Sequence, residues 1–219
     1  MPQTRALIFD MDGTLVDNME YHAKAWIALF ADNGVAVTEE EFYRTAGMKA
    51  TETVRHFMGG EVPEDQCRMY AAQKEFLYRY LYRPKLRPVR GLRPLIRSAR
   101  SHGLKLAVAT ASSRRNIEFT LGGLGLRDAF DAVAGAHEVE RGKPHPDLFL
   151  LAARRMEVEP EQCLVFEDAG NGLEAAHRAG MRAIGVATFH SHADLASYPS
   201  TVRVVRHFGE LRLREVLGG

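Results

Sequence analysis

The chain has 219 residues, of which 46% are hydrophobic and 26% are charged. These proportions are ordinary for a protein with a packed core, and they exclude the polar, highly charged composition of a disordered chain. The 29 Lys and Arg residues nearly balance the 28 Asp and Glu residues, so the net charge of +1 provides no overall field for nucleic acid or an anionic membrane. Neither is expected as a partner.

The cysteines and the apolar runs indicate the compartment. Cys67 and Cys163 lie far apart and match no zinc-binding spacing, so a disulfide framework is not expected. The first apolar run is interrupted at Asp10, which makes it too short for a signal peptide, and no stretch approaches the roughly 18 apolar residues of a membrane span. We expect a cytoplasmic protein, and the sequence leaves its oligomeric state open between a monomer and a weak homo-oligomer.

Short apolar runs predict buried strands at 6–9, 104–109, 132–134, 164–166 and 183–186. Helical patterns lie between the later runs, at 92–101, 114–121, 147–155 and 172–179. Strands that are apolar on both faces and alternate with helices are typical of a parallel sheet covered on both sides. The predicted fold class is therefore α/β, with a doubly wound, Rossmann-like parallel sheet as its core.

The alternation stops between about residues 16 and 84, where the patterns are helical. Ala23, Trp26, Ile27 and Phe30 fall at i, i+3, i+4 and i+7, which predicts one apolar stripe on a helix from Met19. Three more helices are expected, beginning at the capping box at 38–41, after residue 51 and after residue 63, the last ending near residue 82. These helices predict a second, helical domain at 16–87, inserted into a core domain of 1–15 and 88–219 through two connections suited to hinge closure.

Two carboxylates directly follow the first predicted strand, in the segment DMDGTL at 10–15. Asp10 and Asp12 would both reach a pocket beyond the carboxyl end of the strand, where open α/β sheets bind ligands. An Asp is a competent nucleophile toward phosphorus, and a second Asp can exchange a proton with the leaving oxygen and then with water. Gly13 allows a sharp turn beside a ligand. The alternative is a simple Asp/Gly turn.

Hydroxyl groups follow the strand at 104–109, in the segment TASS at 110–113. Hydroxyls and backbone N–H groups at a turn from strand to helix can hold a phosphate. The same pattern is equally that of a helix N-cap.

A lysine and a pair of acids occur in the remaining two loops. Lys143, in the segment GKPHPD at 142–147, can supply positive charge to an anionic site, or it is a solvated lysine in a proline-rich loop. Glu167 and Asp168 directly follow the strand at 164–166 and suit a Mg²⁺ site, while the alternative for them is an acidic helix N-terminus.

Together these segments supply a nucleophile, an acid/base group, phosphate donors, a cation and metal ligands, all at the carboxyl ends of predicted strands. The order DMDGT, TAS, KP and ED resembles the four motifs of the haloacid dehalogenase superfamily across almost the whole chain. The helical insert after the first motif resembles that family's C1 cap, as found in its β-phosphoglucomutase-like phosphatase branch.

The resemblance implies specific roles for the residues of the first three motifs. It makes Asp10 the nucleophile and Asp12 the general acid/base. Thr110 and Lys143 would bind the phosphate, and Ala111 would donate its backbone N–H to it.

The resemblance also implies a bound Mg²⁺. Its ligands would be the carboxylates of Asp10 and Asp168 and the backbone carbonyl of Asp12, with Glu167 binding directly or through water. Charge supports this, because the four nearby carboxylates of Asp10, Asp12, Glu167 and Asp168 would repel one another and a phosphate dianion without a divalent cation and Lys143.

The cap residues are inferred from the same resemblance. His22 stands where the family's mutases and many phosphatases carry a His near the acid/base, or it packs beside Trp26. Gly47 and Lys49 align with the specificity loop of the cap, and Lys74 aligns with a cap lysine of the mutases. The alternative for both lysines is a solvated side chain without a role in binding. Mutases typically have an Arg where this chain has Ala50, which weakens the mutase interpretation.

We therefore expect a Mg²⁺-dependent phosphatase that hydrolyses a small phosphorylated metabolite, such as a sugar phosphate, through an aspartyl-phosphate. One alternative is a sugar-phosphate mutase of the β-phosphoglucomutase type. The other is a binding protein that senses a phosphorylated ligand without turnover, although such a protein has no use for Asp12. The sequence does not name the substrate.

Overall fold

The computed structural model describes residues 3–43, 48, 50–212 and 214. The chain divides into two compact units. One comprises Met1–Asp17 with Arg87–Gly219, and the other comprises Asn18–Leu86. Among the described residues, no helix has the length and apolar character needed to cross a membrane.

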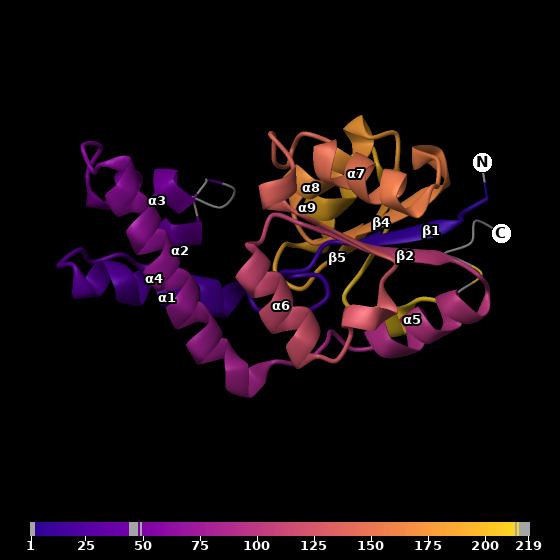
Figure 1. Ribbon diagram of the computed structural model, residues 1–219, viewed down its shortest axis with the longest axis horizontal. Helices are drawn as coiled ribbons and strands as arrows, with labels where there is room; N and C mark the ends of the chain where they lie inside the picture. Colours follow the sequence, from indigo (N-terminus) through magenta and orange to yellow (C-terminus); the bar gives the residue numbers. More distant parts are fainter. Residues whose placement is uncertain (1–2, 44–47, 49, 213, 215–219) are drawn as a thin grey trace. The chain divides into compact units, whose positions relative to one another are not determined.

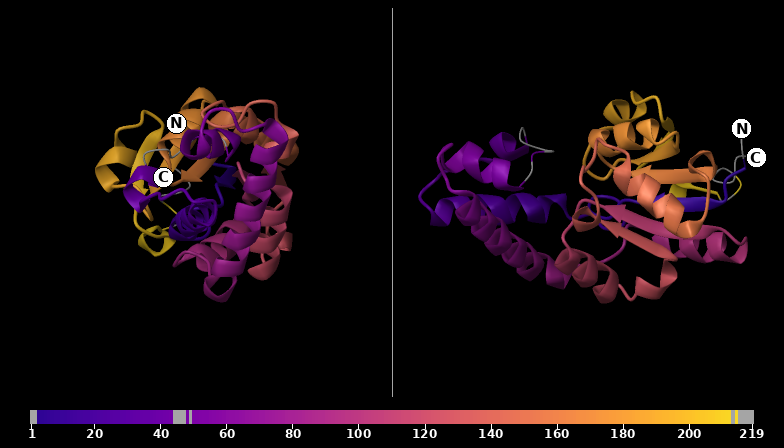
Figure 2. Two further views of the ribbon diagram at one scale, coloured as in Figure 1. Left: turned by 90° about the vertical axis from the view of Figure 1, so that its left-hand side faces the viewer. Right: turned by 45° about the horizontal axis from the view of Figure 1, so that its top comes forward.

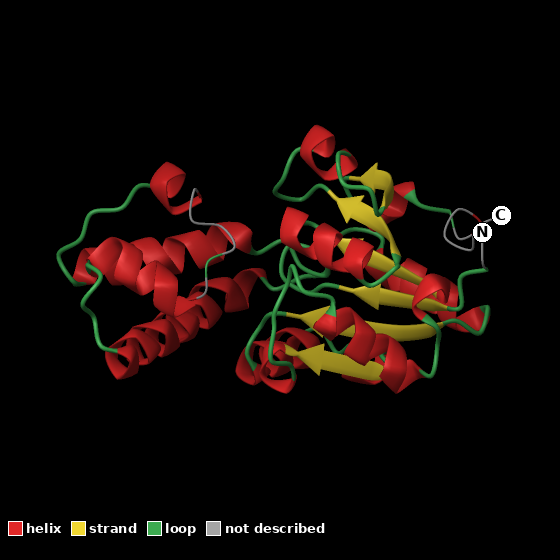
Figure 3. Ribbon diagram, turned by 90° about the horizontal axis from the view of Figure 1, so that it is seen from above, coloured by secondary structure: helices red, strands yellow, loops and turns green. Residues whose placement is uncertain are grey.

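In the described part of the chain, the first unit contains one six-stranded sheet in the order β3-β2-β1-β4-β5-β6, and every neighbouring pair of strands is parallel. Figure 3 shows these strands side by side. Their bounds are β1 (Ala6–Phe9), β2 (Lys105–Thr110), β3 (Ala132–Gly135), β4 (Cys163–Glu167), β5 (Arg182–Val186) and β6 (Thr201–Val205). The predicted doubly wound α/β class is confirmed.

Helices cover both faces of this sheet. On one face lie α5 (Leu92–Ser101) and α6 (Arg114–Gly123). On the other lie α7 (Asp147–Met156), α8 (Gly170–Arg178) and α9 (His192–Ala196), as Figure 1 shows. Because both faces are covered, the central strands β1 and β4 are buried along their whole length and carry almost only apolar residues.

The last strand and the last helix were not predicted from the sequence. Strand β6 lies at the edge of the sheet, and its residues Val202 and Arg203 are exposed, so it lacks the continuous apolar run of a central strand. Helix α9 has five residues, which is too short for a helical period to be recognised.

Aromatic packing anchors the two central strands to each other. The ring of Phe9 on β1 stacks on that of Phe166 on β4 with 4.7 Å between centroids, and Phe208 meets both rings edge-on. All three side chains are buried. Aromatic pairs of this geometry stabilise a core by about 0.5–1.5 kcal/mol each beyond the area that they bury. They therefore hold firmly the ends of β1 and β4, from which the acidic residues extend.

The chain reverses its direction of winding between β1 and β4. It passes from β1 outward to β2 and β3, and then returns to β4 on the other side of β1. In open α/β sheets, a ligand site forms at such a switch point, beyond the carboxyl ends of the strands. Asp10 follows β1 at this edge, and Glu167 ends β4.

Within the described residues, the second unit holds four α-helices, which are α1 (Met19–Asp32), α2 (Glu39–Tyr43), α3 (Ala50–Met58) and α4 (Glu64–Tyr82). Helix α1 packs on α2 and α4, and α3 packs on α4 (Figure 2). The start of α2 is fixed as the sequence predicts, since the Thr38 Oγ1 accepts from the Glu41 N–H at 3.2 Å and Glu41 accepts from the Thr38 N–H at 2.9 Å. In the predicted apolar stripe of α1, Ala23, Trp26 and Phe30 are buried and Ile27 is partly buried.

Candidate active site

Three buried carboxylates meet at the switch point of the sheet. Asp10 follows β1, Glu167 ends β4, and Asp168 is the next residue. Each offers one carboxylate oxygen, and these three oxygens lie within 4.8 Å of one another. The hydrogen bond from the Asp10 N–H to the Phe166 carbonyl, at 2.9 Å, joins the ends of the two strands and so fixes the backbones that carry this acidic cluster.

Lys143 brings a positive charge to the acidic cluster. Its Nζ atom lies 2.5 Å from Oδ1 of Asp10 and 3.1 Å from Oε2 of Glu167, and its side chain is buried. The ring of Phe149, on α7, lies 4.9 Å from the same Nζ atom. Lys143 comes from the loop between β3 and α7, so the structure unites the first, third and fourth motifs of the sequence.

Burial and like charges control the protonation of this group. Burial, and more weakly the Asp12 charge, raise the pKa of Asp10 to about 6, although Lys143 opposes this shift. Burial and the neighbouring Asp10 carboxylate raise the pKa values of Glu167 and Asp168 well above those of exposed acids. Burial acts against the charge of Lys143, but the charges of Asp10 and Glu167 outweigh it and raise the lysine pKa.

When its three buried carboxylates are all ionised, the acidic cluster carries more negative charge than the single ammonium of Lys143 can balance. Its donors are carboxylate oxygens, which hard divalent cations such as Mg²⁺ prefer. A cation would relieve both the burial cost and the mutual repulsion. The cluster therefore fits a divalent metal ion by its donor type, its spacing and its charge.

The loop after Asp10 is shaped to pass beside Asp168. Gly13 has a φ of +84°, and a Cβ atom at this position would collide with the Asp168 carboxylate. The next residue, Thr14, donates its hydroxyl to Oδ1 of Asp168 at 3.2 Å. On the other side, the Thr188 hydroxyl donates to the Gly13 carbonyl at 2.5 Å. Thr188 follows β5, so two strands hold this loop.

The second motif contributes through Ser112. Its hydroxyl donates to Oδ2 of Asp12, which links the loop after β2 to the loop after β1. Thr110 ends β2 and is buried, and its Oγ1 accepts from the Ser112 N–H at 3.1 Å. Ala111 lies between them and is exposed. This turn precedes α6, whose N-cap Ser113 accepts from the Asn116 N–H. The predicted N-cap and the predicted phosphate turn are thus adjacent parts of one segment.

The Glu167 side chain lies directly against the backbone of a glycine. A Cβ atom at Gly172, in the first turn of α8, would collide with Oε1 of Glu167. Gly172 therefore makes room for the carboxylate, whereas a Cβ atom at Gly170 would collide with Tyr198.

In the second unit, the partly buried His22 and the buried Lys74 belong to one cluster. Lys74 Nζ lies 2.9 Å from Nδ1 of His22 and 2.8 Å from the Glu75 carboxylate. The His22 ring stacks on that of Tyr78 with 3.8 Å between centroids, and the Tyr78 hydroxyl accepts from Asn18 at 2.6 Å. Lys74 is therefore a buried, paired lysine, which differs from the solvated alternative.

The remaining predicted cap residues are not placed. Gly47 and Lys49 lie outside the described residues. Ala50 is described and is the first residue of α3.

The sequence reasoning missed three residues that touch the predicted site. Thr14 lies within the first motif and Ser112 within the second. Both could have been predicted, because each carries a hydroxyl group close in sequence to a candidate residue. Thr188 had only its place after an apolar strand, because its contact with Gly13 joins segments 175 residues apart.

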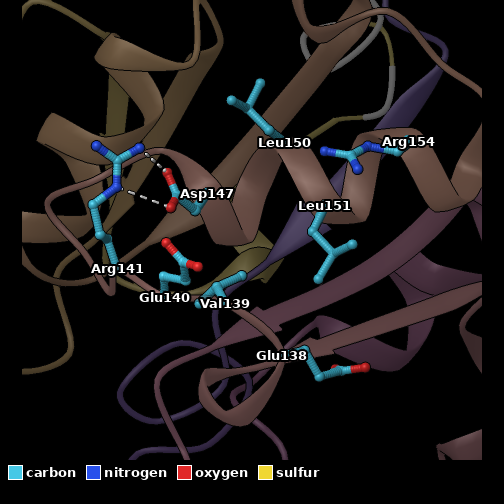
Figure 4. Close-up of a pocket in the computed structure, with 8 residues that line it drawn as sticks. All are labelled: Glu138, Val139, Glu140, Arg141, Asp147, Leu150, Leu151 and Arg154. Atoms are coloured by element: carbon cyan, nitrogen blue, oxygen red, sulfur yellow. Dashed lines mark hydrogen bonds and ion pairs between the residues drawn. The ribbon is translucent and has the colours of Figure 1, made fainter.

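The first unit, which contains the acidic cluster, also has a separate pocket with a volume of 640 Å³. Figure 4 shows its walls, which are Glu138, Val139, Glu140, Arg141, Asp147, Leu150, Leu151 and Arg154. Arg141 and Asp147 close one side with two hydrogen bonds of 3.1 and 2.9 Å. The residues of the acidic cluster are not among its walls, so this described hollow is distinct from the candidate active site.

Comparisons with known proteins identify the family of the chain. The family model of the haloacid dehalogenase-like hydrolases matches residues 4–180. The fructose-1-phosphate phosphatase YqaB of Escherichia coli (strain K12) is 37% identical over 182 residues, which cover 82% of this chain and 95% of that protein.

Solved structures share the complete fold. The crystal structure of a HAD hydrolase from Entamoeba histolytica HM-1:IMSS is similar with a TM-score of 0.92 at 25% identity, covering 98% of both chains. The β-phosphoglucomutase of Clostridium difficile is similar with a TM-score of 0.85 at 26% identity, covering 97% of this chain and 95% of that one. The chain therefore belongs to the haloacid dehalogenase-like hydrolases, in their β-phosphoglucomutase-like branch, and is a phosphoric monoester hydrolase.

Proposed function

We propose that the protein is a Mg²⁺-dependent phosphatase that hydrolyses a small sugar phosphate through an aspartyl-phosphate at Asp10. One observation carries the proposal. Among the described residues, Lys143 is the only lysine whose ammonium group lies within 4 Å of the Asp10 carboxylate. Two further buried carboxylates lie beside Asp10. A nucleophile held between a cation and a site for a metal ion suits attack on an anionic phosphate.

The chain's own residues divide the reaction into two steps. An Asp10 oxygen attacks phosphorus, the bond to the leaving alkoxide breaks, and Asp12 donates a proton to that alkoxide. Asp12 then takes a proton from water, whose oxygen attacks the phosphorus of the aspartyl-phosphate and releases inorganic phosphate. The hydrogen bond from Ser112 orients the Asp12 carboxylate for these transfers.

Charge stabilisation comes from several groups around the transferred phosphate. Lys143 supports the proposed anion site with its buried ammonium group. Thr110 and the backbone N–H of Ala111 would hold the phosphate oxygens at the turn before α6. A bound Mg²⁺ would be held by Asp10, Asp168 and the Asp12 carbonyl, with Glu167 as a direct or water-mediated ligand, and would neutralise charge on the phosphate.

We assign the helical unit the role of a cap that covers the substrate, with domain boundaries at 16–87. The cluster of His22, Lys74 and Tyr78 supports this assignment, because it places basic and aromatic groups together on α1 and α4. Gly47 and Lys49 are proposed as parts of the specificity loop. Closure of such a cap would exclude bulk water and select the leaving group. We place the enzyme in the cytoplasm, where phosphorylated metabolites occur.

The substrate class follows from the phosphatase relative. YqaB is named as a fructose-1-phosphate phosphatase, and the present chain covers 95% of it at 37% identity. We therefore propose a monophosphorylated sugar of similar size as the substrate.

A mutase is the second candidate, and its support is the similarity to β-phosphoglucomutase. A mutase must hold a bisphosphate intermediate in two orientations, for which a bidentate arginine is well suited. Ala50 stands where mutases have that arginine and offers no such group. Water is then the better acceptor for the phosphoryl group.

One assay separates these two outcomes. β-Glucose 1-phosphate is supplied with Mg²⁺ and a glucose bisphosphate primer, and inorganic phosphate and glucose 6-phosphate are followed together. We expect phosphate to form faster than glucose 6-phosphate, and a panel containing fructose 1-phosphate identifies the preferred sugar. Stoichiometric conversion to glucose 6-phosphate with negligible phosphate would make the mutase the correct assignment.

A further inference from the structure

Helix α4 exposes large apolar side chains to solvent. Met69 is 48% exposed, Phe76 is 67% exposed and Tyr80 is 69% exposed. Among the described residues, only two other large hydrophobic side chains are similarly exposed, Met48 and Val202. Scattered single exposures are normal on a protein surface, but three on one helix indicate a surface that another molecule covers.

These side chains share one face of the helix. At about 100° per residue, positions 65, 69, 72, 76, 80 and 83 fall within an arc of about 80°. Cys67, Lys74 and Tyr78 are buried and lie on the opposite side. The exposed face is therefore separate from the cluster that contains His22.

The ends of this face carry opposite charges. Asp65 lies in the first turn of α4, and Arg83 is its C-cap residue with helical dihedral angles, so it continues the same face. Both side chains are exposed, as is Ala72 in the middle. We define the α4 face as Asp65, Met69, Ala72, Phe76, Tyr80 and Arg83.

The α4 face is complementary to itself. When two copies of α4 are laid antiparallel about a two-fold axis that crosses the α4 face at the level of residue 74, residue i of one copy lies at the level of residue 148 − i of the other. Asp65 then meets the partner copy's Arg83, and Phe76 meets the small side chain of Ala72. Both pairings occur twice, because a two-fold interface repeats every contact.

We propose that the α4 face is a docking surface for a second copy of this chain, with the two α4 helices antiparallel. Opposed helix dipoles and opposite charges at the ends both favour this direction. Any other partner would need charged, large and small side chains at the same spacing, whereas a second copy of α4 already has them. Since a stable interface buries roughly 800 Å² on each partner and one helix face supplies less, we expect a weak dimer with a Kd of about 10–500 µM.

Sedimentation equilibrium of the full chain over about 5–500 µM tests the proposal, with circular dichroism to confirm folding. We expect a concentration-dependent dimer, and we expect Phe76→Lys to weaken it more than about tenfold because a charge replaces the central apolar contact. Val202→Lys is the matched control, since it makes the same kind of change at a site that is 53% exposed on β6. A chain that remains monomeric at all concentrations would overturn the proposal, as would a dimer that Val202→Lys disrupts and Phe76→Lys does not.

A charge exchange tests the antiparallel register itself. Asp65→Arg and Arg83→Asp each place like charges together at both ends of the helix pair, so each should raise the Kd about three- to tenfold at low salt. The double variant exchanges the two charges and should restore the dimer. If the double variant is as weak as the single variants combined, the pairing of Asp65 with Arg83 is wrong.

Discussion

Lys143 Nζ lies 2.5 Å from Oδ1 of Asp10, although 133 residues separate the two in the chain. The contact joins the first and third motifs and puts a buried cation against the proposed nucleophile. The lysine also contacts Glu167 at 3.1 Å, so one ammonium group links the ends of β1 and β4.

Replacing this lysine should impair the reaction far more than it impairs folding. Lys143→Met keeps the length of the side chain and removes its charge, and we expect kcat to fall by a factor of roughly 100 or more, as when a preorganised charge stabiliser is lost. Arg141→Met is the control, because this nearby arginine is exposed and pairs with Asp147 instead. Steady-state kinetics of both variants decide the point, and a Lys143→Met enzyme within a few-fold of the parent would exclude the lysine from the site.

Binding of a divalent ion should stabilise the protein, because it offsets the repulsion among Asp10, Glu167 and Asp168. We expect millimolar Mg²⁺ to raise the thermal midpoint of the parent protein by several degrees. Asp168→Asn should reduce this increase strongly. Thermal unfolding with and without Mg²⁺ measures the effect without any substrate, and an equal increase in both proteins would place the ion elsewhere.

The space beside Glu167 provides a steric test of the same site. Gly172→Ala introduces a methyl group where the Glu167 carboxylate lies, so the carboxylate must move. The expected result is a rise of about tenfold or more in the Mg²⁺ concentration that gives half-maximal activity. Gly122→Ala, also in a helix but facing open space, should leave that concentration unchanged. Equal behaviour of the two variants would show that the position of Glu167 is unimportant.

The ion pair between Glu138 and Arg155 should contribute to stability in a defined pH range. The hydrogen bond from Arg155 lowers the pKa of Glu138 from 4.5 to about 2. A lowered pKa means that the stabilisation is complete above pH 4.5 and disappears as the pH falls toward 2. Glu138→Gln should therefore cost on the order of 1 kcal/mol of unfolding free energy at neutral pH, and progressively less in acid.

Urea unfolding of the parent and of Glu138→Gln between neutral pH and about pH 3 checks this dependence. Glu140→Gln is the control, because Glu140 lies in the same segment and Arg155 pairs with Glu138 instead. A cost that stays constant down to the lowest pH would mean that Glu138 stabilises the fold by a route other than its charge.

The central strands and the helices between them could be predicted because burial on both faces gives them continuous apolar runs. β1 was predicted with its exact bounds, 6–9, and β4 differs by one residue at each end. β6 could not be predicted in this way, because an edge strand needs apolar residues only where it is covered. The fold class can thus be predicted from the sequence because the central strands are buried on both faces.

The contacts of the site could be predicted from the sequence only where a general rule of the fold determines them. The meeting of Asp10, Lys143, Glu167 and Asp168 follows from the rule that parallel strands share one carboxyl edge. The contact of Thr188 with Gly13 depends on which loop folds back over which strand, and no local pattern encodes that. Nor does the sequence reveal that Lys74 is buried against His22, since a lysine on a helix is most often solvated.

The central claim is that Asp10 becomes phosphorylated during turnover, and trapping of the intermediate tests it most directly. The enzyme is mixed with Mg²⁺ and excess fructose 1-phosphate, quenched in acid within milliseconds and treated with borohydride, which reduces an aspartyl-phosphate to homoserine. Peptide mass spectrometry should find homoserine at position 10 in the parent and none in Asp10→Asn, whose turnover should be lost. Wild-type turnover by Asp10→Asn, after deamidation is excluded, or a modified residue elsewhere in the chain would contradict the account.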